Sequence, residues 1–220
     1  AGETAAAGTI IARVTARRKP VRGLTGRKIG RAARGAFNAR LNGVPTGGPY
    51  AVELRVVDAA GQVADRVAVR DVYVGDVWIL AGQSNMQGCG LLDRRLPAIP
   101  QVRAFYMDDR WAAAEDPIHQ LWKAVDPVHD AQNNRPPAAG PVVGVGPGVA
   151  FGQALWQATG VPQGLLACAH GGTSMAQWSP ELKQRGGGSL YGAMLRRLRK
   201  NGGRAAGLLW YQGESDALAE

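Results

Sequence analysis

Hydrophobic and polar residues alternate along the first third of the chain, and longer apolar runs follow in the rest. Up to about residue 73 the alternation has a period of two, which is typical of antiparallel strands with one buried face. We predict strands at residues 10–14, 37–41, 50–56 and 67–69. Residues 58–61, Asp-Ala-Ala-Gly, predict a hairpin turn. These strands form either a small β-sandwich-like module or an extension of the main sheet.

Beyond residue 75 the pattern changes to strand-length apolar runs that are separated by helical segments. The runs predict strands at residues 77–81, 102–106, 164–169 and 206–211, and the segments predict helices at residues 148–159 and 190–201. Strands that alternate with helices form a parallel sheet with helices on both faces. We therefore predict an α/β protein in two parts, a β module over residues 1–74 and a larger domain over residues 75–220.

A serine follows the first of these apolar runs almost at once. Gly82 allows a sharp turn, and Gln83 and Ser84 come directly after it. Ligands bind at the carboxyl ends of the strands in open α/β sheets. A serine presented there can act as a nucleophile, and the N–H groups of the following helix can stabilise an oxyanion. The alternative is that Ser84 only caps that helix.

Polar groups also follow the other predicted strands. Gln212, Glu214 and Asp216 come after the strand at residues 206–211, and a glycine pair with hydroxyl residues comes after the strand at residues 164–169. A further segment, residues 144–151, is rich in glycine and opens a helix. Parallel strands would bring a hydroxyl, a carboxamide and a carboxylate to one edge of the sheet.

In this order the motifs resemble those of the SGNH-type esterases, in the branch of the sialic-acid-specific O-acetylesterases and the acetylxylan esterases of carbohydrate esterase family six. The resemblance rests on Gly82-Gln83-Ser84-Asn85-Met86, Gly146-Pro147-Gly148, Gly171-Gly172-Thr173 with Trp178, and Trp210-Tyr211-Gln212-Gly213-Glu214-Ser215-Asp216. It covers the chain from about Asp71 onward. It implies the SGNH hydrolase fold, a flavodoxin-like parallel sheet with helices on both faces, and related esterases often carry a small β module ahead of it.

The resemblance also implies acyl transfer to water, in which Ser84 attacks an acetyl carbonyl and the acetyl-enzyme is then hydrolysed. The family's oxyanion hole maps onto the backbone N–H groups of Ser84 and Gly146 and the amide of Gln212. Glu214 is the candidate acidic partner of a histidine, and Asp216 is the second choice. The alternatives are a plain turn for Gly146, a buried amide that bonds loop backbone for Gln212, and a capping carboxylate for Glu214.

The chain departs from the family pattern at the general base, which the family carries in a C-terminal Asp-x-x-His segment. His119 and His129 have this spacing from Asp116 and Asp126, but they precede the glycine-rich loop, and we expect them in loops or at the domain surface. His170 could line the pocket. The resemblance thus implies that the C-terminal part of the esterase domain is missing, with the base on the remainder or on a second polypeptide.

Three residues after the glycine pair are candidates for substrate binding. Thr173, Ser174 and Trp178 could face a sugar, because hydroxyl groups and an aromatic face suit carbohydrate, although Trp178 could equally pack in the core. The expected partner is an acetylated carbohydrate. The sequence does not rank acetylated sialic acid against acetylated xylan.

The net charge of +9 raises the question of a polyanionic partner. Lysines and arginines cluster between residues 17 and 34 and between residues 196 and 200. Because the clusters lack interleaved aromatic residues and nucleic-acid motifs, no nucleic-acid partner is expected. We interpret Arg196, Arg197, Arg199 and Lys200 as the solvated face and last turn of an amphipathic helix.

Other features narrow the function further. Cys89 and Cys168 could approach each other, but two buried free thiols are favoured. No histidine and cysteine spacing suits a metal site, and no cofactor is expected. No apolar run is long enough to cross a bilayer. No signal peptide is visible, although the family resemblance favours a secreted or periplasmic location.

The sequence leaves three functions open. The first is a carbohydrate O-acetylesterase with a serine nucleophile, whose activity in this chain alone is left open. The second is a non-catalytic carbohydrate-binding relative with the same fold. The third is a basic polyanion-binding protein on an α/β scaffold.

Overall fold

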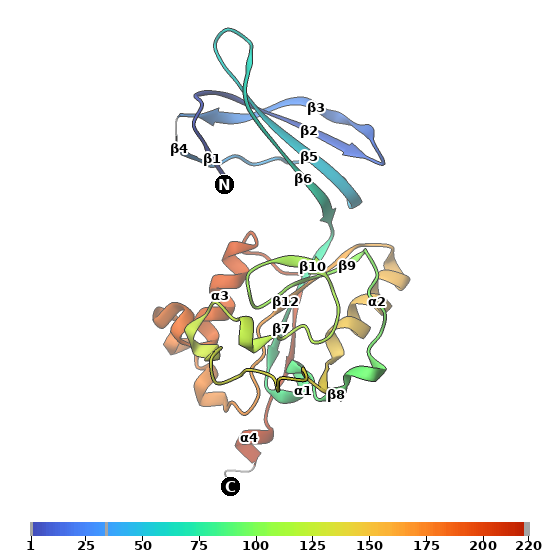
Figure 1. Cartoon of the computed structure of the whole chain (residues 1–220), viewed down its shortest axis with the longest axis vertical. Helices are drawn as coiled ribbons and strands as arrows, with labels where there is room; N and C mark the ends of the chain where they lie inside the picture. The colour runs from blue at the N-terminus through green and yellow to red at the C-terminus, as the bar shows by residue number, and fades with distance from the viewer. Residues whose placement is uncertain (1, 34, 218–220) are drawn as a thin grey trace. The chain divides into compact units, whose positions relative to one another are not determined.

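A computed structural model describes residues 2–33 and 35–217 of the chain (Figure 1). Contacts within the chain divide it into two compact units, Ala1–Val74 and Gly75–Glu220. Each unit has its own sheets and its own hydrophobic clusters. They are described separately.

The first unit consists of strands. They are β1 (Gly2–Thr4), β2 (Gly8–Ala16), β3 (Lys19–Ala32), β4 (Gly35–Phe37), β5 (Gly47–Val57) and β6 (Val63–Val74). Four of them form an antiparallel sheet in the order β3-β2-β5-β6, and β1 pairs with β4 separately. This sheet is distinct from the sheet of the second unit, so the strands do not extend the main sheet.

The predicted period of two is clearest in β2, where Ile10, Ala12 and Val14 are buried and the residues between them are more exposed. The predicted hairpin turn is confirmed: Gly61 N donates a hydrogen bond to the Asp58 carbonyl over 3.2 Å, between β5 and β6.

The strand predicted at residues 37–41 is wrong, because β4 ends at Phe37 and the chain is irregular after it.

The longest strand of the first unit, β3, was not predicted. Of its 14 residues only Leu24 and Ala32 are buried, and most of the others are glycine, lysine, arginine or other exposed residues. The alternation that marks a strand is therefore absent, and β3 forms through its pairing with β2. The first basic cluster lies largely on this strand. Arg34, which belongs to that cluster, falls outside the described residues.

The second unit contains a five-stranded sheet and helices. Its main strands are β7 (Asp76–Gly82), β9 (Val102–Phe105), β10 (Trp111–Ala113), β12 (Gln163–Ala167) and β13 (Gly207–Tyr211). Their order is β10-β9-β12-β7-β13. The four strands β9, β12, β7 and β13 are parallel, and β10 is antiparallel to β9. A separate pair joins β8 (Gly90–Leu91) and β11 (Val143–Val145).

The order of the parallel strands differs from the flavodoxin-like order predicted above. In a flavodoxin-like sheet the first strand lies between the second and the third. Here the third parallel strand, β12, lies between the first, β7, and the second, β9. β9 is followed by the antiparallel β10 instead of a crossover helix, and this hairpin forms one edge of the sheet.

Helices cover both faces of the sheet. The longer ones are α2 (Pro147–Thr159) and α3 (Leu190–Lys200), and α1 (Ser84–Gln87) and α4 (Glu214–Ala217) are single turns. Short 3₁₀ segments lie at Leu92–Arg94, Leu121–Lys123, Pro127–His129, Met175–Trp178 and Pro180–Gly188. Leu80 and Leu165 pack with α2, whereas their neighbours Ile79 and Leu166 pack with α3. The two helices accordingly lie on opposite sides of the sheet (Figure 1).

Candidate active site

The turn that presents Ser84 depends on Gly82, the last residue of β7. Gly82 has a φ of 129°, and a Cβ atom at this position would lie 2.0 Å from the carbonyl oxygen of Tyr211 on β13. Only glycine fits so close to a neighbouring strand at this φ. The chain turns here, Gln83 is buried at the N-cap, and Ser84 is the first residue of α1.

The Ser84 side chain does not cap the helix. Gln83 occupies the cap position and makes no side-chain cap bond. Ser84 is half-buried, and no hydrogen bond of its hydroxyl occurs within residues 2–33 and 35–217. The alternative interpretation of Ser84 as an N-cap is therefore wrong, and the hydroxyl lies at the carboxyl end of the parallel strand β7.

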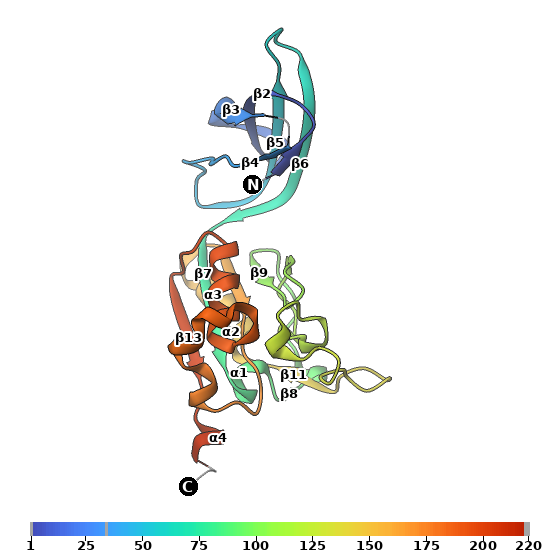
Figure 2. The same cartoon turned by 90° about the vertical axis from the view of Figure 1, so that its left-hand side faces the viewer.

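Both sequence neighbours of Ser84 are bound to the segment that follows β13. Figure 2 shows β13 beside β7, with α4 just beyond the end of β13. Gln83 Oε1 accepts hydrogen bonds from Gln212 Nε2 (3.0 Å) and from Ser215 N (3.2 Å). Asn85 donates its amide to the Glu214 carboxylate. Two segments about 130 residues apart thus meet around one serine.

The Nε2 group of Gln212 is engaged in this arrangement. Besides Gln83, its Nε2 donates to the backbone carbonyl of Thr173 over 2.5 Å. Asp216 accepts from the backbone N–H of Met175 at 3.0 and 3.1 Å and from Gln212 Nε2 at 3.3 Å, so it holds a neighbouring loop. Gln212 therefore makes the contact that the alternative interpretation predicts, in which its amide bonds the backbone of a loop.

Two buried acceptor oxygens on the side chains that bind Gln83 and Asn85 lack partners among the described residues: Gln212 Oε1 and Glu214 Oε2. A buried acceptor without a hydrogen bond costs about 1–3 kcal/mol. The second oxygen of the Glu214 carboxylate is consequently suited to accept an N–H group from a further side chain.

The glycine-rich loop packs closely against α1. Gly146 is the cap of α2, Pro147 is its first residue, and a Cβ on Gly146 would lie 3.0 Å from the Met86 carbonyl. Burial raises the pKa of Asp116 to about 6, although the nearby backbone N–H groups of Gly146 and Ile118 oppose this shift. Asp116 therefore borders the glycine-rich loop.

The end of β12 borders the same turn. His170 N donates to the Gly82 carbonyl over 3.0 Å, and Gly171 N donates to Gln87 Oε1 over 2.6 Å. A Cβ on Gly171 would lie 3.5 Å from the Ser84 Cβ, so the first residue of the glycine pair approaches the serine closely.

The three candidate substrate residues make local structural contacts. Thr173 and Trp178 are buried, and the indole N–H of Trp178 donates to Thr173 Oγ1 over 3.1 Å. The Trp178 ring packs edge-on against Trp210 at 5.1 Å between centroids. Ser174 forms a capping box with Gln177 at the start of a 3₁₀ segment. These contacts agree with the packing alternative for Trp178.

His119 lies in a loop, as one part of the expectation had it, and His129 lies in a 3₁₀ segment. Neither is at the surface, because they are 3% and 1% exposed. His119 Nδ1 lies 3.1 Å from the Gln87 carbonyl, and His129 Nδ1 lies 3.3 Å from His170 Nδ1. Burial lowers the pKa of His119 to about 4 and that of His129 to about 3, and His170 adds to the shift of His129. The apolar neighbours Ile118 and Val128 were the sequence signal of this burial.

The solvated helix face predicted at residues 196–200 is also wrong in part. Arg197 is fully buried, and its guanidinium bonds Asp109 and the carbonyls of Phe105 and Tyr106. Arg196 forms ion pairs with both Asp109 (2.7 Å) and Asp126 (2.5 Å). The amphipathic pattern of α3 could not reveal these partners, because they come from loops about 70 to 90 residues earlier.

The two cysteines are free, as favoured, but only Cys168 is buried. Cys89 is exposed, and its thiol donates to the Ser84 carbonyl over 3.2 Å. Across the described part of the chain, no three histidine, cysteine, aspartate or glutamate side chains gather in a way that could hold a metal ion. No helix within those residues is long and apolar enough to cross a membrane.

Two proteins described as carbohydrate esterases are similar to this chain in sequence or fold. The probable carbohydrate esterase At4g34215 of Arabidopsis thaliana is 34% identical over 163 residues, which cover 64% of this chain and 55% of the relative. Its crystal structure matches with a TM-score of 0.48, at 33% identity, over 65% of this chain and 59% of that one. XAC1771, a carbohydrate acetylesterase from Xanthomonas citri, matches in fold with a TM-score of 0.54, at 23% identity, over 96% of this chain and 47% of that one.

The family model described as carbohydrate esterase, sialic acid-specific acetylesterase, matches residues 74–220. The chain therefore belongs to this family, and the resemblance seen in the motifs is confirmed. The chain spans about half the length of the relatives that it matches.

Proposed function

We propose that this protein is a carbohydrate O-acetylesterase in which Ser84 is the nucleophile. The observation that carries the proposal is the convergence at Ser84: a hydroxyl at the end of β7, flanked by Gln83 and Asn85, which bind Gln212 and Glu214 from the end of β13. Membership of the carbohydrate esterase family supports the substrate class. An acetylated sugar is the proposed substrate, of either the sialic acid or the xylan type.

In the proposed reaction, Ser84 Oγ attacks the acetyl carbonyl carbon and its proton passes to a general base. The tetrahedral intermediate collapses when the sugar oxygen leaves with a proton, and water then hydrolyses the acetyl-enzyme. The backbone N–H groups of Ser84 and Gly146 are the proposed oxyanion donors, each worth about 3 kcal/mol. Gln212 could contribute only if its Nε2 group turned away from Thr173.

Glu214 is proposed as the acid that orients the histidine base. Its Oε1 is held by Asn85, and its buried Oε2 is a free acceptor within the described residues, as such an acid requires. We do not assign the base to His119 or His129, because both are buried and bond groups other than Ser84. Thr173 and Trp178 are not proposed to contact the sugar, and Ser174 remains a candidate because it is half-exposed.

The test is acetate release from an acetylated sugar and from p-nitrophenyl acetate by the full-length protein. Ser84→Ala should lower kcat at least about a thousandfold and leave stability nearly unchanged, because the hydroxyl makes no hydrogen bond in the described structure. Glu214→Gln should lower kcat by about a hundredfold or more, whereas Asp216→Asn should mainly affect stability. Turnover by Ser84→Ala equal to that of the wild type would exclude the proposal. Binding of the sugar without hydrolysis by the wild type would favour a non-catalytic carbohydrate-binding protein.

A further inference from the structure

The positive charge of the protein is concentrated in its first unit. Residues 1–74 hold 13 lysines and arginines against five aspartates and glutamates, whereas residues 75–220 hold 13 against 12. The proposed esterase chemistry lies in the second unit, which is nearly neutral. The charge of the first unit is therefore not explained by the proposed reaction.

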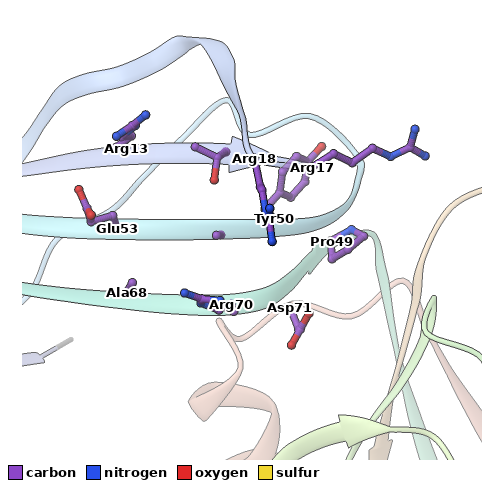
Figure 3. Close-up of a pocket in the computed structure, with 11 residues that line it drawn as sticks. Arg13, Arg17, Arg18, Pro49, Tyr50, Glu53, Ala68, Arg70 and Asp71 are labelled. Atoms are coloured by element: carbon purple, nitrogen blue, oxygen red, sulfur yellow. The ribbon is translucent and has the colours of Figure 1, made fainter.

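Part of this charge surrounds a cleft in the first unit with a volume of about 500 Å³. The cleft is lined by side chains of β2, β5 and β6 and by the turn between β2 and β3 (Figure 3). Its cations are Arg13, Arg17, Arg18 and Arg70. Its anions are Glu53 and Asp71, so the lining carries a net positive charge.

The four arginines of the cleft make no ion pair within residues 2–33 and 35–217. Glu53, one of the two acids of the lining, is paired with Arg55 over 2.5 Å. In the second unit, by contrast, Arg196 and Arg197 are bonded to Asp109. The guanidinium groups of the cleft thus keep their donors available for an external anion, which guanidinium binds in bidentate fashion.

The turn at one end of the cleft carries arginines where the backbone disfavours them. Arg17 and Arg18 are the two residues between β2 and β3, and their φ angles are 48° and 65°. Two-residue hairpin turns with positive φ at both positions strongly favour Asn-Gly. Two arginines here cost conformational free energy, and such strained positions tend to occur where a side chain has a function.

Further cations extend the cleft across the sheet. Four residues lie opposite one another in the register of the four strands, in the order Lys28 on β3, Ile11 on β2, Arg55 on β5 and Arg66 on β6. Residues directly opposite one another point to the same face of a sheet, and this row lies two positions from Arg13 along β2. Arg55 is paired with Glu53, so within the described residues Lys28 and Arg66 add the unpaired charge of this row. Neighbouring strands are about 4.8 Å apart, so these cations and the arginines of the cleft form an extended track and not a single ion site.

We propose that this cleft and track bind a carboxylate-bearing polysaccharide, and so hold an acidic acetylated glycan on the enzyme. The inference rests on the proposed function for the choice of a glycan. The lining of the cleft favours recognition of charge over stacking of bases. Its one aromatic residue, Tyr50, is only 7% exposed, and the Tyr50 hydroxyl donates to the Pro45 carbonyl. Stacking platforms for nucleic-acid bases require exposed aromatic rings.

The test measures binding of polygalacturonate to the full-length protein, with an uncharged xylan and an oligothymidylate as comparisons. We expect polygalacturonate to bind at low salt and to weaken as salt rises. The double substitution Arg17→Asn with Arg18→Gly should weaken binding about tenfold or more, because it removes two of the four unpaired arginines. It should also raise stability, because Asn-Gly suits the turn, so a loss of binding could not result from unfolding.

The matched control is Lys183→Gln with Arg204→Gln, which removes the same charge from exposed positions of the second unit. This variant should bind polygalacturonate like the wild type. Equal binding by the turn variant, an equal loss in the control, or tighter binding of the oligothymidylate would each overturn the inference. All variants should hydrolyse p-nitrophenyl acetate like the wild type. Absent hydrolysis with intact polygalacturonate binding would count against the proposed function alone.

Discussion

At the scale of single residues, Gly82 is the position on which the Ser84 turn depends most. Its φ of 129° and the 2.0 Å approach of the Tyr211 carbonyl both exclude a side chain. The same closeness lets Gln83 N donate to the Tyr211 carbonyl over 2.9 Å, which fixes the turn against β13. One missing methyl group thus allows the strand ends that carry Ser84 and Gln212 to meet.

Gly82→Ala should destabilise the second unit by about 3 kcal/mol or more, because the new Cβ overlaps the backbone of the neighbouring strand β13. Urea unfolding followed by tryptophan fluorescence measures this, since all six tryptophans lie in residues 75–220. Gly160→Ala is the control: its φ is also positive, at 68°, but nothing lies within 4 Å of the added atom. That variant should lose only about 1 kcal/mol, and equal losses would contradict the argument.

At the scale of elements, ion pairs with loops hold α3 on the sheet as well as apolar packing. Asp109 accepts from Arg196, Arg197 and Lys200. Burial alone would raise the pKa of Asp109, but the hydrogen bonds from Arg196 and Lys200 outweigh it and lower that pKa to about 2. Asp126, the other partner of Arg196, directly precedes the 3₁₀ segment that contains His129.

Asp109→Asn should destabilise the second unit by about 3 kcal/mol, because the buried Arg197 would lose its only carboxylate among the described residues. Asparagine tolerates the left-handed φ of 62° at this position, so the loss would report the charge and not the backbone. Glu115→Gln, which breaks the exposed pair with Arg95, is the matched control and should change stability by less than about 1 kcal/mol. Similar values for both variants would refute this account of α3.

At the scale of the whole molecule, buried histidines tie stability to pH. The pKa values of His119 and His129 are lowered by burial to about 4 and about 3, and that of His170 is lowered as well. Unfolding returns them to about 6.5, so the unfolded chain binds more protons in mild acid. Their contribution to stability is complete above about pH 6.5 and is lost as the pH falls toward 4. Asp116 opposes this, because its raised pKa lets the folded state bind a proton first.

The free energy of unfolding should therefore fall between about pH 6.5 and pH 4, and His119→Gln should make the fall shallower by about 1.4 kcal/mol per pH unit. Urea unfolding by tryptophan fluorescence at several pH values measures both slopes. Asp116→Asn should change the slope in the opposite sense, because it removes the compensating proton uptake. An unaltered slope in His119→Gln would show that this histidine is not the source of the acid sensitivity.

The sequence by itself determined the elements whose burial has a period. The apolar runs predicted β7, β9, β12 and β13 within a residue or two, and the helical spacing predicted α2 and α3. Sequence motifs also identified the family, whose model matches residues 74–220. These elements can be predicted from the sequence because the periodicity arises from residues that are close together in the chain and lie on the same face of one strand or helix.

Only the tertiary structure decided what depends on partners distant along the chain. The polar strand β3 forms because β2 pairs with it, and Arg197 is buried because Asp109 and two carbonyls receive its guanidinium. The strand order β9-β12-β7-β13 also depends on partners distant along the chain, and so does the hydrogen bond from the Gln212 amide to Thr173. Burying a polar group costs free energy unless a hydrogen bond or an ion pair offsets that cost. The group that does so comes from a distant part of the chain, so the neighbouring residues in the sequence do not reveal it.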